Sequence, residues 1–245
     1  MSGSFVEHYG LSRNRFGRLL ARGLLRSLHA IGQLICRVRI DILNRERLEI
    51  EGPVIMAANH CSLIDTPVLY LSIPAGLRHH TATVGGLDYF QALPGQPRLE
   101  RWFRRSVIWF IRGSMSVLLI DRVQGEYDRV DRLGDVLSQG WSLMIFPEAT
   151  RSRSGRIGRF RHGAAELAGR HQVSVIPIRI DGTDRVLPPG VGWPRSGRIV
   201  VAIGEPIQRK NDETASAFTA RIRCEIEALG ESQGCAAIAA LESTA

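Results

Sequence analysis

His60 and Asp65 are the two residues of this sequence whose types and spacing most directly indicate chemistry. The histidine follows a strand-like run, and the aspartate precedes Thr66-Pro67, a pair typical of a first helical turn. Across such a turn a carboxylate can reach the imidazole, fix its tautomer and stabilise the imidazolium that forms when the histidine takes a proton from a hydroxyl. The pair is therefore a candidate general base. Asp65 has a second interpretation as an ordinary helix N-cap, and the spacing alone leaves both open.

A second polar cluster runs from Phe146 to Gly155 and reads FPEATRSRSG, directly after a strand-like run. Ligands usually bind in loops at the carboxyl ends of strands in α/β sheets. Hydroxyls, two arginines and backbone N–H groups in one short loop can surround a phosphate. A solvated loop would also explain the charges, but it leaves Glu148 beside an apolar strand end without a stated partner.

Two neighbouring pairs of residues offer weaker signals. Cys61 beside His60 raises the idea of a thiol nucleophile, but adjacent residues of an extended segment point to opposite faces. His79 and His80 raise metal binding, but no carboxylate or cysteine accompanies them in the neighbouring sequence, and a solvated loop is the simpler interpretation. We therefore expect no metal site, and no cofactor beyond the substrates.

Hydrophobic periodicity predicts the elements that must position these residues. Strand-like runs lie at 48–50, 54–57, 81–84, 117–120, 143–146, 173–180 and 199–203. Helical patterns alternate with them, beginning at Thr66-Pro67 and ending by Pro74, and then at 99–111, 127–137, 163–169 and 214–229. This alternation predicts an α/β fold with a mixed, largely parallel sheet flanked by helices. The glycine- and proline-rich residues 184–198 are expected to form a long loop.

Residues 16–38 carry apolar side chains at three- and four-residue spacing, with arginines over much of the rest, which predicts a basic amphipathic helix before the sheet. Such a helix either lies in a membrane interface or packs on its own domain. A segment at 102–112 mixes four aromatic residues with three arginines and suits a membrane boundary, a nucleic acid or an ordinary half-buried helix. We expect three regions: a membrane-associating helical segment at 1–40, a catalytic domain at 41–230 and a flexible tail at 231–245.

The composition limits the class of protein. The 245 residues are 44% apolar and carry a net charge of +8, which excludes a mainly disordered chain and suffices for a core. Four cysteines without a CxxC pair favour a reducing compartment. No apolar run approaches the ~20 residues of a membrane-spanning helix, and the start MSGSFVEHYG lacks the apolar core of a cleaved signal peptide. All basic residues except Lys210 are arginines, which reflects either a coding bias or guanidiniums that hold anions.

Taken in order, four motifs resemble those of the glycerolipid acyltransferase family, which includes the bacterial 1-acylglycerol-3-phosphate acyltransferases. They are Asn59-His60-(x)4-Asp65, Ile120-Asp121-Arg122, Phe146 to Ser152, and Val175 to Ile178. The stretches Arg159 to Ala164 and Ile203 to Ile207 also resemble the family, and the likeness covers roughly residues 40 to 210. One HxxxxD pair is a weak signal, but the ordered set is a strong one.

The resemblance implies an O-acyltransferase that moves a fatty acyl group from acyl-CoA or acyl carrier protein to a lysophospholipid hydroxyl. Of the possible acceptors, the resemblance most favours 1-acylglycerol-3-phosphate, whose acylation gives phosphatidic acid. His60 would be the general base and Asp65 would orient it, without an acyl-enzyme intermediate. The resemblance places Pro177 in the acyl-side wall and Arg151 on the acceptor's phosphate. The full set of implied substrate-binding residues is Asn59, Ser62, Arg122, Glu148, Ala149, Thr150, Arg151 and Arg161.

Two residues depart from the family's usual pattern. Ala149 stands where glycine is usual, and Arg161 stands where lysine is common. Another lipid acceptor, such as a different lysophospholipid, an ornithine lipid or a glycolipid, therefore stays open. So do an acyl thioesterase, in which the same histidine activates water, and a non-catalytic module that binds membranes or nucleic acid.

Membrane contact follows from the same resemblance, because the donor's acyl chain and the lipid product are both amphiphiles. We expect a peripheral or monotopic membrane protein on the cytoplasmic face of the cell membrane. Residues 16–38 would be the main contact and residues 102–112 a second one. For the acyltransferase, no nucleic-acid partner is expected.

Overall fold

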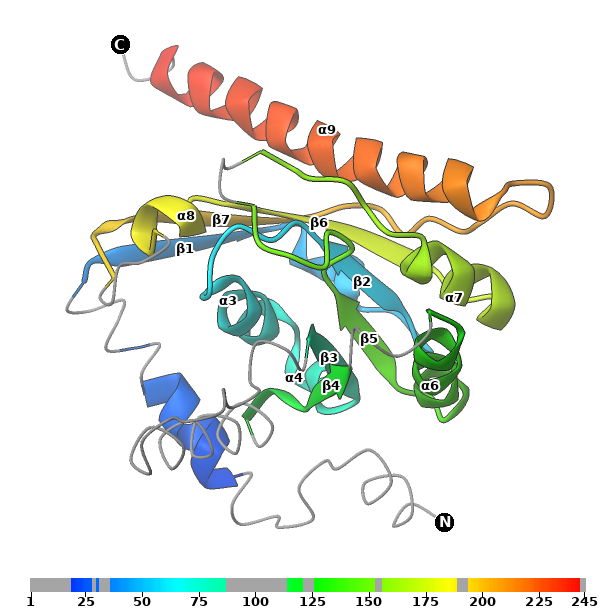
Figure 1. Ribbon diagram of the computed structural model, residues 1–245. Coiled ribbons are helices and arrows are strands. Elements are labelled where there is room, and N and C mark those ends of the chain that lie inside the picture. Colours follow the sequence, from blue (N-terminus) through cyan, green and yellow to red (C-terminus); the bar gives the residue numbers. More distant parts are fainter. Residues whose placement is uncertain are drawn as a thin grey trace, which may run out of the picture.

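The computed structural model of the chain describes residues 19–27, 30, 36–86, 114–120, 126–152, 156–188 and 194–242. Within these residues the chain forms a seven-stranded sheet in the order β1-β7-β6-β2-β5-β3-β4, with helices against both faces (Figure 1). The pair β6 and β7 is antiparallel, and the other five pairs are parallel. The prediction of a mixed, largely parallel sheet flanked by helices is confirmed.

The elements follow one another in alternation along the chain. The strands are β1 (Val38–Leu43), β2 (Ile55–Ala58), β3 (Thr81–Gly86), β4 (Val117–Ile120), β5 (Ser142–Ile145), β6 (Val175–Asp181) and β7 (Gly197–Ile203). The helices are the short 3₁₀ helix η1 (Arg45–Leu48), α3 (Asp65–Ser72), α4 (Ala75–His79), α6 (Glu126–Ser138), α7 (Gly163–His171), α8 (Thr183–Val186) and α9 (Ala215–Glu242). Residues 19–27 are also helical.

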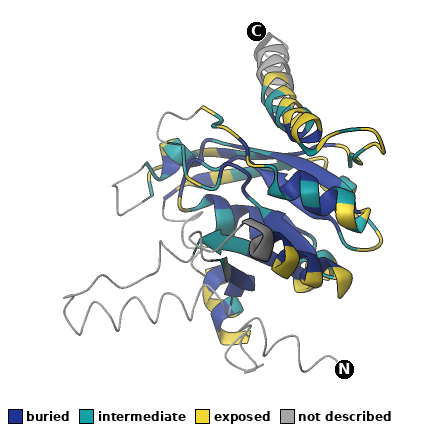
Figure 2. Ribbon diagram, turned by 45° about the vertical axis from the view of Figure 1, so that its right-hand side comes forward, coloured by how far each residue is buried: buried dark blue, intermediate teal, exposed yellow. Residues whose placement is uncertain are grey.

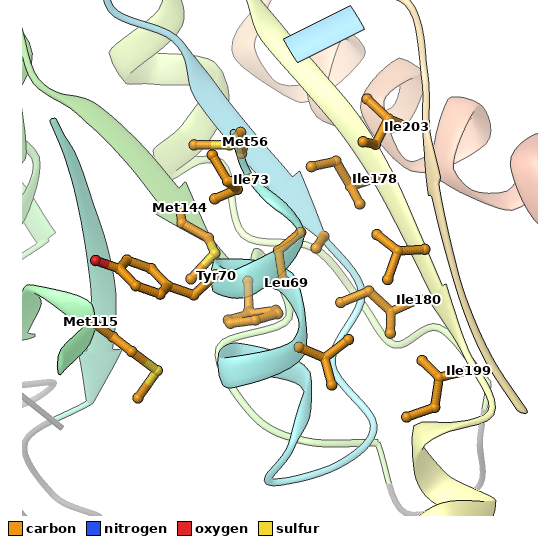
Figure 3. Close-up of a cluster of buried hydrophobic side chains, with 14 of the residues drawn as sticks. Met56, Leu69, Tyr70, Ile73, Met115, Met144, Ile178, Ile180, Ile199 and Ile203 are labelled. Atoms are coloured by element: carbon orange, nitrogen blue, oxygen red, sulfur yellow. The ribbon is translucent and has the colours of Figure 1, made fainter. Parts of the chain in front are cut away.

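The sheet separates two hydrophobic cores. In β2, Met56 and Ala58 belong to the core under α3, while Ile55 and Ala57 belong to the core under α6, α7 and α9. This division follows from the pleat, because successive side chains of a strand point to opposite faces. Figure 3 shows part of the first core, with Leu69 and Tyr70 of α3 lying over the strands. Burial is deepest in the central strands (Figure 2), so the segments that leave them start from rigid positions.

Two predictions near the start of the chain differ from the structure, although the predicted N-terminal helix itself is present at residues 19–27. The helix predicted to reach Val38 ends earlier, because Val38–Leu43 forms β1, which pairs in parallel with β7. Arg37, immediately before this strand, has a φ of 50°, which is not a helical conformation. The predicted strand at 48–50 is wrong as well, because Leu48 ends η1. The alternation of apolar and polar residues from Val38 to Ile42 is the strand period, and pairing with β7 stabilises that strand.

Other differences concern the ends of elements. Helix α9 runs to Glu242 and so extends into residues 231–245, for which the sequence predicts a flexible tail. Residues 231–242 contain four alanines, which have the highest helix propensity. The loop predicted at 184–198 is shortened at both ends by α8 and β7. The predicted helix at 99–111, the aromatic segment at 102–112 and Arg122 lie outside the described residues.

Candidate active site

Two neighbouring central strands deliver the candidate catalytic residues to one edge of the sheet. β2 ends at Ala58 and continues directly into His60, while β5 ends at Ile145 and continues into Glu148. The two strands pair in parallel, with Ala57 opposite Ile145. Because parallel strands present their carboxyl ends at the same edge, the two motifs meet there although they are far apart in the sequence.

His60 and Asp65 form a direct pair. The distance from His60 Nδ1 to Asp65 Oδ2 is 2.8 Å, and the Asp65 side chain is 1% exposed against 19% for His60. Asp65 Oδ2 also accepts hydrogen bonds from the backbone N–H groups of Cys61, at 2.6 Å, and Ser62, at 2.7 Å. The carboxylate therefore turns back to the loop and the imidazole, although Asp65 itself opens α3. Of the two interpretations of Asp65, the geometry favours the one in which it orients the histidine.

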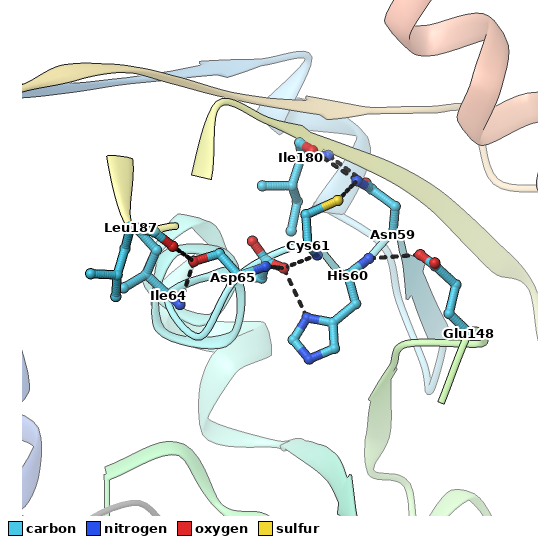
Figure 4. A network of polar contacts seen from close by, with 9 residues as sticks. Asn59, His60, Cys61, Ile64, Asp65, Glu148, Ile180 and Leu187 are labelled. Carbon is cyan, nitrogen blue, oxygen red and sulfur yellow. Dashed lines mark hydrogen bonds and ion pairs between the residues drawn. The ribbon is translucent and has the colours of Figure 1, made fainter. Parts of the chain in front are cut away.

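Two side chains hold the imidazole of His60: Asp65 at the ring edge and Phe146 at the ring face. Its ring stacks on Phe146, with 4.3 Å between ring centroids and 23° between planes. Because a carboxylate only accepts hydrogen bonds, the Nδ1 atom that faces Asp65 carries the proton, which leaves the lone pair on Nε2. Figure 4 shows the imidazole with one nitrogen bonded to Asp65 and the other directed away from it. A histidine in this arrangement can act as a general base through Nε2.

Glu148 connects the two loops that form the site. Its Oε1 accepts a hydrogen bond from the backbone N–H of His60, at 2.9 Å, and its Oε2 accepts one from the backbone N–H of Gly158, at 2.8 Å. Ser152 donates its backbone N–H to the carbonyl oxygen of His60, at 2.8 Å. Glu148 is buried, so a missing partner would leave a desolvated charge. The partners of Glu148, which the sequence does not reveal, are therefore the backbone N–H groups of His60 and Gly158. We call residues 59–64, between β2 and α3, the His60 loop.

Comparison with known proteins identifies the family to which the chain belongs. The model of the acyltransferase family matches residues 39–181, which is more than half of the chain and includes both loops of the site. The chain belongs to the acyltransferase family.

Curated relatives of this acyltransferase carry consistent names. One is the chloroplastic 1-acyl-sn-glycerol-3-phosphate acyltransferase LPAT1 of Arabidopsis thaliana, 28% identical over 69% of this chain and 44% of that protein. Another is the chloroplastic 1-acyl-sn-glycerol-3-phosphate acyltransferase BAT2 of Brassica napus, 28% identical over 83% of this chain and 54% of that protein. The chain thus spans about half the length of the curated relatives it matches.

A solved structure has the same fold as this acyltransferase. It is the 1-acyl-sn-glycerophosphate acyltransferase PlsC from Thermotoga maritima, with a TM-score of 0.63 and 22% sequence identity. The likeness covers 94% of this chain and 88% of that one. It supports the arrangement of the sheet and helices described above.

Two polar residues of the acyltransferase's first motif, Asn59 and Ser62, form hydrogen bonds with backbone groups of the protein. The side chain of Asn59, 1% exposed, accepts from the backbone N–H of Ile180 at 2.7 Å and donates to the Ile180 carbonyl at 2.8 Å. The Ser62 hydroxyl donates to the carbonyl of Leu187, at 2.8 Å. These contacts tie the His60 loop to the end of β6 and to the segment after α8. Both residues thus hold His60 in place, with no polar group of Asn59 left over for a ligand.

Pro177 is the one predicted site residue among those described that lies within a strand. Pro177 lies within β6 opposite Ala57 of β2. A Cβ on Gly204 would lie only 2.7 Å from the Pro177 ring, so the proline packs closely against that glycine. Ala57 belongs to the core under α6, α7 and α9, whereas Phe146, which stacks on His60, belongs to the other core. These neighbours of Pro177 include none of the other predicted site residues, so they add no support for its expected place in the acyl-side wall.

The third motif surrounds a cavity. Glu148, Thr150 and Arg161 line a cavity of about 600 Å³, together with Ser152 and residues 156–162. Ala149 and Arg151 lie in the same loop, and Arg122 is outside the described residues. Periodicity gives no sign of this cavity, because it forms only where the loop after β5 meets the segment before α7.

Ala149 adopts a backbone conformation that suits glycine, with a φ of 59°. For a residue other than glycine, this left-handed conformation costs roughly 1–2 kcal/mol of conformational free energy. Glycine adopts it at little cost, but glycine loses more backbone entropy on folding. We expect Ala149→Gly to raise the free energy of unfolding by about 0.5–1 kcal/mol, which corresponds to a rise in Tm of about 1–4 °C. Thermal unfolding followed by circular dichroism measures this shift. A lower Tm would mean that the Ala149 methyl group stabilises the loop by packing.

Cys61 is unsuited to act as a nucleophile. Burial, followed by the charge of Asp65, raises the pKa of the Cys61 thiol to about 11, and the thiolate is the reactive form. We expect Cys61→Ala to keep activity within about threefold, and iodoacetamide at pH 8 to label the exposed Cys224 before Cys61. Peptide mass mapping after timed labelling gives the order. Loss of activity that tracks alkylation of Cys61 would contradict the expectation.

His79 and His80 lie at the end of α4. His79 Nδ1 is 3.0 Å from Nη1 of Arg22, and burial together with the Arg22 charge lowers the pKa of His79. His80 packs edge-on against Trp141. Among the residues that the structure describes, no three potential metal-ligating side chains come together.

Proposed function

We propose that the chain is a 1-acylglycerol-3-phosphate O-acyltransferase, which uses an acyl thioester to convert lysophosphatidate into phosphatidic acid. The observation that carries the proposal is the geometry of His60, with Nδ1 bonded to a buried carboxylate and Nε2 directed away from it. The names of LPAT1 and BAT2 support the choice of acceptor. Acyl-CoA and acyl carrier protein are both donors of the right chemistry.

The residues of the chain perform the transfer in two proton movements. His60 Nε2 takes the proton of the acceptor hydroxyl as the hydroxyl oxygen attacks the thioester carbonyl. The new C–O ester bond forms, the C–S bond breaks, and the imidazolium returns its proton to the leaving thiolate. Asp65 stabilises the imidazolium between these steps because its Oδ2 faces Nδ1 at 2.8 Å. In this proposal Arg151 and Thr150 bind the acceptor's phosphate.

The decisive experiment uses purified protein with radiolabelled palmitoyl-CoA and a panel of lysolipids. We expect radiolabelled phosphatidic acid from lysophosphatidate, with CoA release that depends on the acceptor. Release of free fatty acid at the same rate without an acceptor would identify a thioesterase instead. A labelled product from a different lysolipid alone would change the acceptor in this proposal.

The proposed enzyme works at a membrane surface, and the helix at 19–27 supports this. Ala21 and Leu25 of this helix are buried, while Leu19, Leu20 and Leu24 are 67%, 55% and 51% exposed. Water-exposed leucines on one helix face are typical of helices that lie in a lipid interface. No helix among the described residues is both long and apolar enough to cross a bilayer.

Cations accompany the exposed leucines. Arg22 and Arg26 of the same helix lie near Arg78 of α4, and burial followed by their charges lowers the pKa of Arg78. Clustered cations repel one another, and an anionic lipid surface relieves this repulsion. We therefore place the protein peripherally on an anionic membrane, on the cytoplasmic face that its cysteine usage favours. Residues 102–112, the second predicted contact, lie outside the described part of the chain.

Replacing all three exposed leucines of this helix by serine is expected to weaken binding to anionic vesicles by at least about tenfold. Each leucine contributes roughly 1 kcal/mol or more when half-exposed surface enters the acyl region. Co-sedimentation with vesicles that contain phosphatidylglycerol measures the partitioning. Leu43→Ser is the matched control, because Leu43 is 39% exposed but lies in β1. Equal binding of the triple variant and the wild type would remove this helix from the proposed contact.

A further inference from the structure

The cavity beside Glu148 is large enough to take part of a substrate. Its volume of about 600 Å³ lies within the range of small-molecule sites. The loop after β5 and the segment 156–162 form its walls. Glu148 joins the two, because its oxygens bond to the backbone N–H groups of His60 and Gly158. One of the residues that line the cavity, Glu148, therefore contacts the His60 loop.

The charge of the cavity is strongly positive. Ile157 and Phe160 pack against the hydrophobic core. The arginines beside them are exposed to solvent: Arg156, Arg159 and Arg161. All three arginines line the cavity, and Glu148 is the single carboxylate among the described residues that line it. Both Glu148 oxygens already accept hydrogen bonds from the backbone. The guanidiniums are therefore available to a ligand with several phosphates, which they match in geometry.

The cavity and the exposed leucines belong to opposite faces of the sheet. Ile157 and Phe160 pack with the core under α6, α7 and α9, whereas Leu25 of the N-terminal helix packs with the core under α3. Figure 1 shows the helix at 19–27 on the side of the sheet away from α7 and α9. If the leucines contact lipid, the arginines face water. A soluble anion reaches them more directly than a lipid does.

The two substrates of the proposed reaction differ in where they carry phosphate. In lysophosphatidate the phosphate is only a few bonds from the reacting hydroxyl, so it must bind close to His60. In acyl-CoA the phosphates are at the far end of the pantetheine arm, remote from the thioester. We infer that Arg156 and Arg159 bind the nucleotide phosphates of an acyl-CoA donor. This inference rests on the proposed function and names the donor that it leaves open.

Binding of free CoA tests the inference without requiring turnover. Isothermal titration calorimetry compares wild type, the double variant Arg156→Gln/Arg159→Gln and the control Arg132→Gln. Arg132 is an exposed arginine of α6 outside the cavity. We expect the Kd for CoA to rise about tenfold in the double variant, the usual effect of losing charge-assisted contacts to phosphate, and to stay unchanged in the control. An unchanged Kd in the double variant would overturn the inference.

Steady-state kinetics distinguish the two sources of phosphate. The double variant is expected to raise the KM for acyl-CoA about tenfold and to leave the KM for lysophosphatidate within twofold of wild type. A rise in the KM for lysophosphatidate alone would assign the cavity to the acceptor. Wild-type protein that turns over acyl carrier protein but binds no CoA would also overturn the inference. Loss of CoA binding in the variant, with no acyl transfer by wild type, would uphold this site and contradict the proposed function.

Discussion

Replacing His60 by alanine is expected to lower the rate of acyl transfer by about 10²–10⁴-fold while the protein stays folded. This range is the usual contribution of a positioned general base. The imidazole is 19% exposed and sits at the end of a strand, so its loss removes Nε2 and the stacking on Phe146 but leaves the strands paired. Initial rates of acceptor-dependent CoA release measure the change.

His171→Ala is the matched control for this experiment. His171 lies in α7 and contacts Ser138 of α6, away from both site loops. We expect this variant to keep wild-type activity. Unfolding curves of both variants separate a catalytic effect from a loss of structure. Unchanged turnover by the His60→Ala variant would contradict the proposed mechanism.

The second large effect is expected for Asp65→Asn, with kcat lower by about 10²–10³-fold. Asparagine has the same shape, and its oxygen can take the place of Oδ2 opposite His60, Cys61 and Ser62. What disappears is the negative charge that stabilises the imidazolium. Since the acceptor and donor contact other groups, KM for both substrates is expected to change little.

The same substitution carries a stability cost that can be measured separately. Asp65 Oδ1 is buried and has no hydrogen-bond partner among the described residues, and the new NH₂ group would occupy that position. An unpaired buried donor costs roughly 1–3 kcal/mol. Urea unfolding gives this cost, and kinetics well below the unfolding midpoint give the catalytic effect. Asp65→Asn with wild-type kcat would show that the carboxylate only orders the loop.

Much of the architecture was predictable because the local signals and the tertiary structure agree. The runs at 81–84 and 117–120 are strands, and the helical pattern at 163–169 lies within α7. The exceptions are residues 38–43 and 48–50. From Val38 to Ile42 apolar and polar residues alternate, which is the strand period, but the helical pattern that ends at Val38 overlaps it. The run 48–50 is too short to show a period. β1 exists because β7 supplies a parallel neighbour, and no local pattern records a partner that lies so far along the chain.

The candidate site shows the same division between local and distant information. The spacing of His60 and Asp65 was enough to predict their contact, because a single turn of the chain connects them. The roles of Asn59 and Glu148 were not predictable in the same way. Asn59 bonds to Ile180 and Glu148 bonds to Gly158, contacts that require β6 and the loop before α7 to be in place. Residue type alone made both appear as ligand-binding groups.

The sequence by itself determined the class of fold, through strands that alternate with helices, and the candidate acid–base pair, through a histidine and a carboxylate one turn apart. Tertiary structure alone decided which polar groups remain for substrates. Buried polar side chains must find partners, so Asn59 and Glu148 are taken up by backbone groups brought from distant segments. It also gathered Arg156, Arg159 and Arg161 around one cavity, because the apolar residues between them pack into the core.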